Sequence, residues 1–599
     1  MKFPAPLLLG LLAALLLAAP GRAEKVLRYA LRSAETGFDP AQISDLYSKT
    51  ITAAMIEGLL EYDFSTRPYR LRPNTAAALP EVSPDARTFT VRVKPGIYFA
   101  DDPAFKGQKR ELTAQDYVYS LKRHYDPRWK SQNLYLLENL KILGLSELRK
   151  ASIDAKKPFD YDREVEGLKA LDRYTLQIRV ADPAPRLPAY LTDSGSFGAV
   201  AREVVEFYGD KIMEHPVGTG PFKLGDWRRS SRIVLDRNPN YREVLYNEVP
   251  PTDDPRLAAE MAALQGKRMP FVDKVQIEIT EEPQPRWLSF VRGETDVIEY
   301  VPPEFTGIAM PGNKLAPNLA KQGIRMVRYN RPDISVTYYN MEDPVLGGYT
   351  PEKVALRRAI NLAVDVDKEV RLPRRGQAMK AQGVVPLTSF GSSPDFKTEM
   401  GEYNLPKAKA LLDLYGYTDK DGDGWRDQPD GKPLVLTYNT EPTADYRALA
   451  ELWQKNMDAL GIRIQFVWAK WPENLKASTA GKLQMWGLGW SAAIDDGDTF
   501  LALGSSKSAG KANKPRFNLP AFEALYDKQK TLPDGPERLA VMLEAQKLLV
   551  AYAPYKFHVH RIWTDMAQPW VKGYNRNVYV KEFFKYVDID EATAPKVTP

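Results

Sequence analysis

Hydrophobic and polar residues alternate along several short stretches of the chain, and this period of two predicts β-strands. The stretches are 25–33, 88–102, 171–185, 271–282, 335–343 and 434–440, and the second and third end in turns with proline. Elsewhere hydrophobic residues recur every three to four positions, which is the spacing of a helix with one buried face. The stretches with that spacing are 352–365, 406–417 and 444–460. Because strands and helices alternate, and because 599 residues are too many for one core, the pattern predicts two or more mixed α/β domains.

The stretch HPVGTGPFKLGDWRRSSRIVLDRNPNYRE, residues 215–243, contains two extended patterns separated by polar residues. The GTG sequence near its start is similar to a phosphate-binding loop. Such a loop needs a helix after it, because the amides at the helix N-terminus bind the phosphate. Here Pro221 begins an extended run instead. The segment therefore predicts a β-hairpin, with Gly218 and Gly220 as turn residues that lead into it.

The segment around Thr113 has the pattern of a helix start. Thr113 can cap the helix and Asp116 stands three residues later, which together make a capping box. Residues 126–170 that follow are polar, rich in lysine and only weakly periodic, and we interpret them as a surface elaboration. The chain has no internal repeat and no low-complexity tract.

The first 23 residues combine a positive charge at Lys2, an apolar run and small residues before Ala23. This combination predicts a secretory signal peptide, 1–23, that is cut after Ala23. The alternative is a membrane anchor, but the apolar run of about 13 residues is shorter than the roughly 20 that span a bilayer. The chain has no cysteine, so it has neither a lipid-attachment cysteine nor a disulfide. We therefore expect a protein that diffuses freely in the periplasm and is not a lipoprotein.

The charge of the chain is nearly balanced. It has 83 Lys and Arg against 77 Asp and Glu, a formal net charge of +6. Removal of residues 1–23 takes away Lys2 and Arg22 and leaves +4. Spread over so large a protein, this excess is too weak to predict nucleic-acid binding.

The motifs of common hydrolases and nucleotide-binding enzymes are absent from the sequence. No G-x-S-x-G motif occurs, and the segment most similar to a P-loop, 504–512, has Ala512 where Ser or Thr is required. Of the four histidines, His558 and His560 share one face of a predicted strand, which supplies only part of a metal site. We therefore expect that the protein is not an enzyme, with a periplasmic hydrolase as the less favoured alternative.

The sequence DKDGDGWRDQPD, residues 419–430, has the spacing of a calcium-binding loop. Such a loop places oxygen ligands at positions 1, 3, 5, 9 and 12, with glycine at position 6 for the turn. The residues at the ligand positions are Asp419, Asp421, Asp423, Asp427 and Asp430. Position 12 is Asp instead of the longer Glu, and Pro429 stiffens the loop, so the alternative is a solvated turn. A structural calcium ion is the one cofactor that the sequence suggests.

Aromatic residues are abundant, with 11 Trp, 31 Tyr and 22 Phe. Trp471, Trp486 and Trp490 lie near glycine-rich turns and a group of acidic residues. Aromatic side chains usually pack in the core, and this is the alternative for each of them. Tryptophans beside glycine turns and carboxylates favour a cleft that accepts ligands of variable shape.

Several segments occur in an order that resembles the family 5 extracellular solute-binding proteins of ABC importers. The segments are 89–102, 112–123, 215–227, 235–241, 271–279, 287–298, 355–365, 461–468 and 569–575. Each is weak alone, but together they extend over essentially the whole mature chain. The family includes dipeptide-, oligopeptide-, nickel- and haem-binding proteins.

This resemblance implies an α/β, periplasmic-binding-protein-like two-lobed fold of type II, in the large cluster with an extra subdomain, and a ligand cleft between the lobes. Lobe I would hold 24–285, with the extra subdomain at about 63–169, and would resume over 567–599. Lobe II would hold 286–566. Both ends of the mature chain would then meet in lobe I.

The resemblance also implies where a ligand binds. In the family, an aspartate three residues after the tryptophan that matches Trp490 pairs with the α-amino group of a peptide, and that position is Ala493 here. Alanine cannot bind an ammonium group, so acids of the same loop are candidates to replace the aspartate, and Trp471 matches a pocket-lining tryptophan. The predicted ligand-binding residues are Trp490, Trp471, Ser491, Asp495, Asp496, Asp498, Tyr338, Tyr339, Asn340 and Phe38.

We therefore expect a periplasmic substrate-binding protein that captures peptides or peptide-like solutes and delivers them to the permease subunits of an ABC transporter in the inner membrane. The alternative keeps this role but changes the ligand to an oligosaccharide, an opine-like conjugate, haem or a metal chelate. Tryptophan stacking favours sugars or planar rings, whereas scarce histidine and absent cysteine disfavour direct metal binding. The protein is expected to act as a monomer and without nucleic acid.

Overall fold

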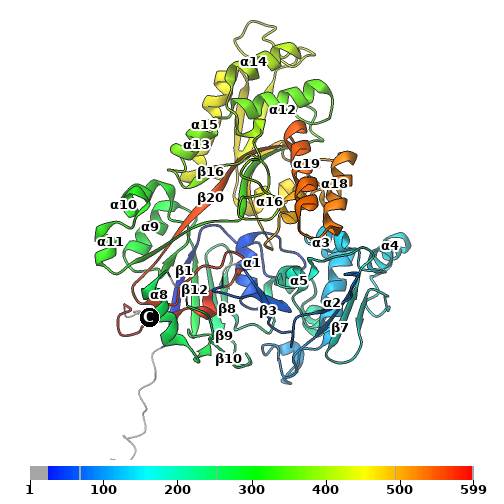
Figure 1. Cartoon of the computed structure of the whole chain (residues 1–599), viewed down its shortest axis with the longest axis vertical. Coiled ribbons are helices and arrows are strands. Elements are labelled where there is room, and N and C mark those ends of the chain that lie inside the picture. The colour runs from blue at the N-terminus through cyan, green and yellow to red at the C-terminus, as the bar shows by residue number, and fades with distance from the viewer. Residues whose placement is uncertain (1–23, 67–68, 251–252, 493, 596–599) are drawn as a thin grey trace, which may run out of the picture.

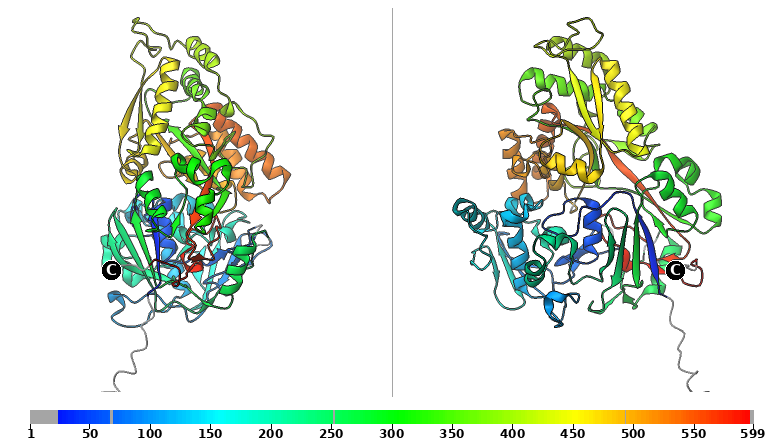
Figure 2. Two further views of the ribbon diagram at one scale, coloured as in Figure 1. Left: turned by 90° about the vertical axis from the view of Figure 1, so that its left-hand side faces the viewer. Right: turned by 180° about the vertical axis from the view of Figure 1, so that it is seen from behind.

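The computed structural model describes residues 24–66, 69–250, 253–492 and 494–595. Two lobes stand one above the other in Figure 1, and the further views in Figure 2 show the same division. The predicted signal peptide, 1–23, lies outside the described residues. In the described part of the chain, none of the helices is long and apolar enough to cross a membrane.

A sheet of twelve strands extends through both lobes. Its order is β18-β17-β19-β15-β20-β13-β1-β12-β9-β8, and β14 and β16 pair with β20 beside this path. The bounds are β1 Val26–Leu31, β8 Phe222–Arg228, β9 Arg232–Arg237, β12 Lys274–Ile279, β13 Val297–Ile298, β14 Arg325–Asn330, β15 Asp333–Tyr339, β16 Ala378–Lys380, β17 Val435–Thr440, β18 Arg463–Trp468, β19 Met485–Ser491 and β20 Tyr555–Ala567. The alternating pattern predicts β1, β12, β15 and β17, and the structure confirms all of them.

Strand β20 connects the two lobes. Up to Arg561 it pairs with β15 and β16, and from Ile562 onwards it pairs with β14. The chain also crosses between the lobes over residues 331–332, between Asn330 at the end of β14 and Asp333 at the start of β15. We use lobe I for the described residues up to Asn330 and after Arg561, and lobe II for those from Asp333 to Arg561.

Strand pairing assigns more of the chain to lobe I than the resemblance implies. Strand β13 pairs with β1, and helix α9, Pro283–Val291, packs against β13. The small core under these elements contains Ile298 and Met566. Along the chain, the change of pairing partner comes after Asn330 and again after Arg561. The expected lobe boundaries at 286 and 566 stay predictions.

Lobe I contains a second, smaller sheet in the order β4-β5-β7-β6. Its strands are β4 Glu81–Val82, β5 Thr88–Arg92, β6 Leu168–Ala170 and β7 Thr175–Arg179, and the helices of this region are α2 Ala114–Tyr125, α3 Leu134–Leu140 and α4 Leu145–Ala155. The capping box of Thr113 and Asp116 starts α2, as predicted. The two ends of the described chain also meet in lobe I, where Lys25 Nζ lies 2.5 Å from the carboxylate of Asp588.

The stretch 215–243 forms the predicted hairpin, because β8 and β9 pair antiparallel. Gly218 and Gly220 have a different role from the predicted one. Neither has a positive φ, and a Cβ at either position would collide with the backbone of Met55. The N–H of Gly220 also donates to Met55 O at 2.8 Å. The glycines therefore permit close packing of this segment against the end of α1, Leu46–Ala53, instead of a turn.

The helices of lobe II pack against its half of the sheet around two hydrophobic cores. They include α12 Pro351–Ala363, α13 Val366–Arg371, α14 Leu405–Leu414, α15 Ala444–Leu460, α16 Trp471–Thr479, α18 Pro520–Thr531 and α19 Pro536–Tyr552. The periodic stretches predict α12, α14 and α15, which the structure confirms. In Figure 1, α18 lies beside α3 of lobe I, where Asn139 donates to the hydroxyl of Tyr526 at 3.3 Å.

Candidate ligand-binding site

A cavity of about 150 Å³ lies between the lobes. Lobe I contributes Arg32, just after β1, and residues of α1 and α3, whereas lobe II contributes residues of α16 and β19. A second cavity of about 80 Å³ adjoins it, and Arg32, Tyr446 and Arg561 line both. Ligands of α/β proteins often bind beyond the carboxyl ends of the strands, and Arg32 stands at that end of β1. Because both lobes form its walls, the cavity is complete only while the lobes are closed.

Aromatic side chains form part of the cavity wall. Trp490 of β19 and Trp471 of α16 both line it, and so does Ser491. The indole N–H of Trp490 donates to Thr499 O at 3.1 Å, which fixes the ring. Across the lobe boundary, Trp471 meets Tyr47 of α1 edge-on, with ring centroids 6.1 Å apart. These positions support the ligand-binding role that the sequence assigns to the two tryptophans and Ser491, which stays a prediction.

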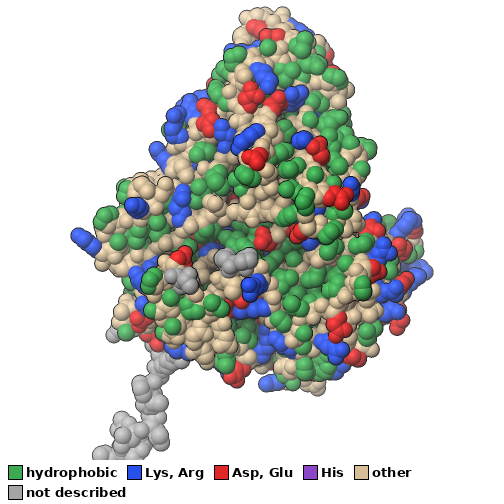
Figure 3. All heavy atoms as spheres, viewed as in Figure 1, with side chains coloured by type: hydrophobic (Ala, Val, Ile, Leu, Met, Phe, Trp, Pro, Cys, Tyr) green, Lys and Arg blue, Asp and Glu red, His purple; other side chains and the backbone are tan. Residues whose placement is uncertain are grey.

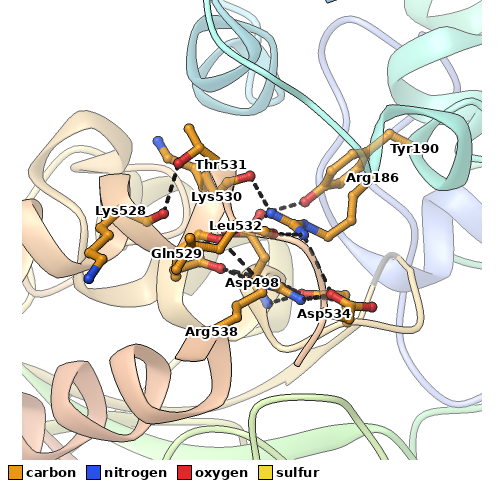
Figure 4. A network of polar contacts seen from close by, with 11 residues as sticks. Arg186, Tyr190, Asp498, Lys528, Gln529, Lys530, Thr531, Leu532, Asp534 and Arg538 are labelled. Carbon is orange, nitrogen blue, oxygen red and sulfur yellow. Dashed lines mark hydrogen bonds and ion pairs between the residues drawn. The ribbon is translucent and has the colours of Figure 1, made fainter. Parts of the chain in front are cut away.

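Asp498 lies in the cavity wall and also joins the two lobes. Tyr190 of α5, Leu187–Tyr190, donates to one oxygen of its carboxylate at 2.7 Å, and Gln529 of α18 donates to the other. Figure 4 shows this network beside Arg186, which donates to the carbonyl oxygens of Gln529 and Leu532. Arg186 and Tyr190 belong to lobe I, whereas their partners belong to lobe II. The network therefore holds the lobes closed next to the cavity.

The other two acids of this loop do not line the cavity. Tyr579 of lobe I donates to Asp495 at 2.7 Å, and Asp496 forms a buried ion pair with Arg538. Both carboxylates therefore have protein partners outside the cavity wall, and their predicted contact with the ligand stays a prediction. Burial raises the pKa of both carboxyl groups. Ala493, the residue at the aspartate position of the resemblance, lies outside the described residues.

Four further predicted ligand contacts are buried away from the cavity: Tyr338, Tyr339, Asn340 and Phe38. The hydroxyl of Tyr338 donates to Ser478, and Phe38 packs edge-on against Trp227, with ring centroids 4.8 Å apart. Strand β15 lies in the middle of the sheet and every one of its residues is buried, so its side chains on both faces are shielded from solvent. The structure therefore places these four residues outside the cavity wall, and their predicted contact with the ligand stays a prediction.

Only part of the predicted calcium loop brings its carboxylates together. The residues whose ligand oxygens lie within 4.8 Å of one another are Asp419, Asp421 and Asp423. Asp427 instead accepts a hydrogen bond from the N–H of Lys420 at 2.9 Å, and Asp430 pairs with Lys432 at 2.7 Å. This corrects the expected five-carboxylate ligand set, while calcium binding by the three exposed carboxylates stays a prediction.

Basic residues that the sequence does not single out line the cavity. They are Arg32, Lys49, Lys511, Lys514, Arg561 and Lys581. Burial lowers the pKa of Lys514 to about 7, and it also lowers the pKa of Lys49 and Lys511. The outer face in Figure 3 differs, since basic and acidic side chains are mixed over both lobes there. No local pattern could identify these residues, because they come from segments far apart in the chain.

The second cavity contains a buried chain of hydrogen bonds. His558 Nε2 lies 3.0 Å from Thr337 Oγ1, and His558 Nδ1 lies 2.7 Å from the carboxylate of Glu369. Burial alone would raise the pKa of Glu369, but His558 and Arg374 lower it to about 2. The order hydroxyl, imidazole, carboxylate is that of an activated nucleophile. Thr337 is only 1% exposed, however, and its hydroxyl is shared with Tyr438 at 3.0 Å, which favours a structural role for these hydrogen bonds.

The geometry defines a two-lobed binding protein that encloses a solute between its lobes. The sequence matches the bacterial extracellular solute-binding proteins, family 5 Middle, over residues 70–512. The chain therefore belongs to the family 5 extracellular solute-binding proteins, as the resemblance implies.

Similar relatives and structures extend over almost the whole chain. The periplasmic oligopeptide-binding protein OppA of Escherichia coli (strain K12) is 26% identical over 90% of each chain. The dipeptide-binding protein of the same strain is 26% identical over 94% of this chain and 95% of its own. The structure is similar to the periplasmic binding protein DppA from Helicobacter pylori in complex with the peptide STSA, with a TM-score of 0.74, 22% identity, and coverage of 95% of this chain and 99% of that one. These likenesses confirm the two-lobed fold.

Proposed function

We propose that this protein is the periplasmic receptor of an ABC importer, which acts as a monomer, encloses a peptide or peptide-like solute and delivers it unchanged to permease subunits in the inner membrane. The cavity whose walls come from both lobes carries the proposal. The names of the relatives support the solute class, since they bind oligopeptides and dipeptides. The predicted signal peptide and the absence of cysteine support the periplasm as its location.

The way in which the lobes are connected explains how capture would work. The chain crosses between the lobes at 331–332 and again within β20, so a change of backbone angles at these two places opens the cleft. Opening separates Tyr47 from Trp471 and exposes the cavity. Closure on a solute buries its apolar surface against Trp471 and Trp490 while polar groups orient it. A solute that contacts both lobes favours the closed state, because it binds that state more tightly.

Two measurements on the unmodified protein test this proposal. Native mass spectrometry of protein purified without refolding should detect a bound solute, and a mixture of peptides should return a subset that is bound and chemically intact. X-ray scattering should give a smaller radius of gyration when the solute is added. Cleaved peptides, or a radius that no bound peptide reduces, would contradict the proposed function.

The hydrolase alternative has one observation in its favour, the chain of Thr337, His558 and Glu369. Replacement of His558 by Gln removes the imidazole that links Thr337 to Glu369 and keeps a side chain that can donate and accept hydrogen bonds. A receptor should keep its solute affinity within a few-fold in His558→Gln and should leave peptides intact in both forms. Peptide cleavage that disappears in His558→Gln would favour the hydrolase.

A further inference from the structure

The acidic side chains of the cavity wall all have partners within the protein. Three carboxylates line the cavity: Asp45, Asp193 and Asp498. Asp45 accepts from the N–H of Ser48 at 2.9 Å, and Asp193 pairs with Lys581 at 2.6 Å. Asp498 accepts from Tyr190 and Gln529, as described above. Among the described residues, the wall therefore offers no carboxylate that is without a partner and free to bind an ammonium group.

The basic side chains of the same wall are only partly matched. Lys581 pairs with Asp193, and Arg561 pairs with Asp333 at 2.6 Å. We call the other four, Arg32, Lys49, Lys511 and Lys514, the basic cluster. In the portion of the chain that the structure describes, no member of the basic cluster forms an ion pair with a carboxylate. The wall thus contains four basic side chains that have no ion-pair partner among the described residues.

The neutral contacts of the basic cluster do not replace a counterion. Lys514 is 3% exposed, and its ammonium group donates to Thr479 Oγ1 at 2.9 Å and Gly510 O at 3.1 Å. Lys49 donates to Asn133 Oδ1 at 3.2 Å. Arg32 stacks on aromatic rings, and its buried Nε has no hydrogen-bond partner among the described residues. Unmatched buried charges and donors are costly, and an acceptor with negative charge would stabilise them.

A second kind of donor in the same wall also lacks a partner. The indole Nε1 of Trp471 is buried and donates to nothing in the described residues. Trp471 and Arg32 come from opposite lobes, so a solute with oxygen acceptors at two places would connect both lobes. Buried donors left unpaired cost roughly 1–3 kcal/mol each, which a solute oxygen would recover.

We propose that the solute of this protein is a peptide-like anion with at least two carboxylates, which the basic cluster binds between the closed lobes. The proposal rests on the receptor function proposed above and specifies its solute class. A neutral dipeptide has one carboxylate and one ammonium group, and the wall has no free carboxylate for the latter. An acidic peptide supplies the negative charges that the basic cluster lacks.

Four tripeptide probes test the solute class by isothermal titration calorimetry. They are Glu-Glu-Glu, its N-acetyl form, Ala-Ala-Ala and Lys-Lys-Lys. We expect Glu-Glu-Glu to bind at least about tenfold more tightly than Ala-Ala-Ala, because hydrogen bonds to charged groups each contribute at least that factor. Acetylation should change the affinity little, since no free carboxylate awaits the amino group. Equal or tighter binding of Ala-Ala-Ala or Lys-Lys-Lys overturns the proposal.

Variants of the basic cluster test which residues bind the anion. Lys511→Met and Lys514→Met should each weaken Glu-Glu-Glu binding about tenfold and weaken Ala-Ala-Ala binding less, because Ala-Ala-Ala has only its terminal carboxylate. Lys511 is partly exposed, so its variant should fold even if Lys514→Met does not. The matched control is Lys507→Met, because Lys507 pairs with Asp527 outside the cavity and should not affect either probe. An equal loss for both probes would indicate a structural role and overturn the proposal.

The probes also separate this proposal from the proposed function. If Ala-Ala-Ala binds and closes the lobes as well as Glu-Glu-Glu does, the receptor function stands and the anion proposal fails. If the tricarboxylate tricarballylate binds and no peptide does, the preference for anions stands and the peptide part of the proposed function fails. Binding of no acidic probe overturns the anion proposal.

Discussion

We expect Arg186→Ala to weaken solute binding about tenfold although Arg186 lines neither of the two cavities described above. Arg186 precedes α5 in lobe I, and its guanidinium donates to Leu532 O at 3.1 Å, to Gln529 O at 3.2 Å and to Lys530 O. These carbonyls lie at the end of α18 in lobe II, where the helix dipole attracts a cation (Figure 4). The alanine variant loses every one of these bonds between the lobes.

The size of the effect follows from the difference between closed and open lobes. In the closed state the Arg186 side chain is only 12% exposed, so water cannot replace its partners well. In the open state water hydrates both the guanidinium and the carbonyls. The hydrogen bonds of Arg186 therefore stabilise the closed state over the open state by a net free energy of about 1–3 kcal/mol. Because the solute binds the closed state, the same free energy appears in its Kd, and about 1.4 kcal/mol is tenfold.

Titration calorimetry with the co-purified solute measures this change, and X-ray scattering at a saturating concentration measures the closed fraction. The matched control is Arg202→Ala, since Arg202 pairs with Asp162 at 2.5 Å and with Glu206 at 2.6 Å inside lobe I. We expect wild-type affinity in the control. The same Kd in Arg186→Ala and wild type, or an equal loss in Arg202→Ala, would refute the assignment of Arg186 to lobe closure.

Three further predictions use other parts of the structure. Trp490→Ala should lose most solute binding with a smaller fall in Tm than Trp486→Ala, because Trp486 is wholly buried in the core; unchanged affinity in Trp490→Ala would contradict the cavity assignment. Burial lowers the pKa of Lys556 to about 7, below its usual value, so the unfolded state binds this proton more tightly. The free energy of unfolding, measured by denaturant titration, should therefore rise from pH 7 to pH 9, by up to about 1.4 kcal/mol per pH unit for this group. If Lys556→Met shows the same rise with pH as the wild type, the assignment to Lys556 is wrong. Addition of about 1 mM Ca²⁺ should raise the Tm of the wild type but not of Asp421→Asn, and equal shifts would exclude the Asp419, Asp421 and Asp423 site.

Local patterns predicted the elements of the fold better than their arrangement. The alternation that predicts β12 and the capping box that starts α2 depend only on neighbouring residues. The connection of the lobes through β20 depends on which strands pair with each part of it, and that is set by contacts hundreds of residues apart. The weakly periodic segment 126–170 likewise hides α3, because only Leu134 and Leu137 of its seven residues are buried.

The candidate site was only partly predictable for a related reason. Alternation reports that a position is buried, but not whether it faces the core or a cavity. Trp490 and Trp486 lie on the same strand, opposite Ile334 and Tyr338 of β15, yet only Trp490 lines the cavity. It does so because the carboxyl end of β19 reaches the boundary between the lobes. The basic cluster had no local signal at all, since Arg32 and Lys514 are almost five hundred positions apart and meet only when the lobes close.

On the proposed solute chemistry, the basic cluster and the Arg186 network act in opposite directions on the empty protein. Closure without a solute leaves basic groups such as Lys514 buried without an ion-pair partner, and this disfavours the closed state. The bonds of Arg186 favour that state. An anion in the cavity removes the first contribution and leaves the second, so closure becomes conditional on the solute. Lys514→Met should then close more readily when empty, whereas Arg186→Ala should close less readily both empty and with solute, and scattering curves of the two variants distinguish these outcomes.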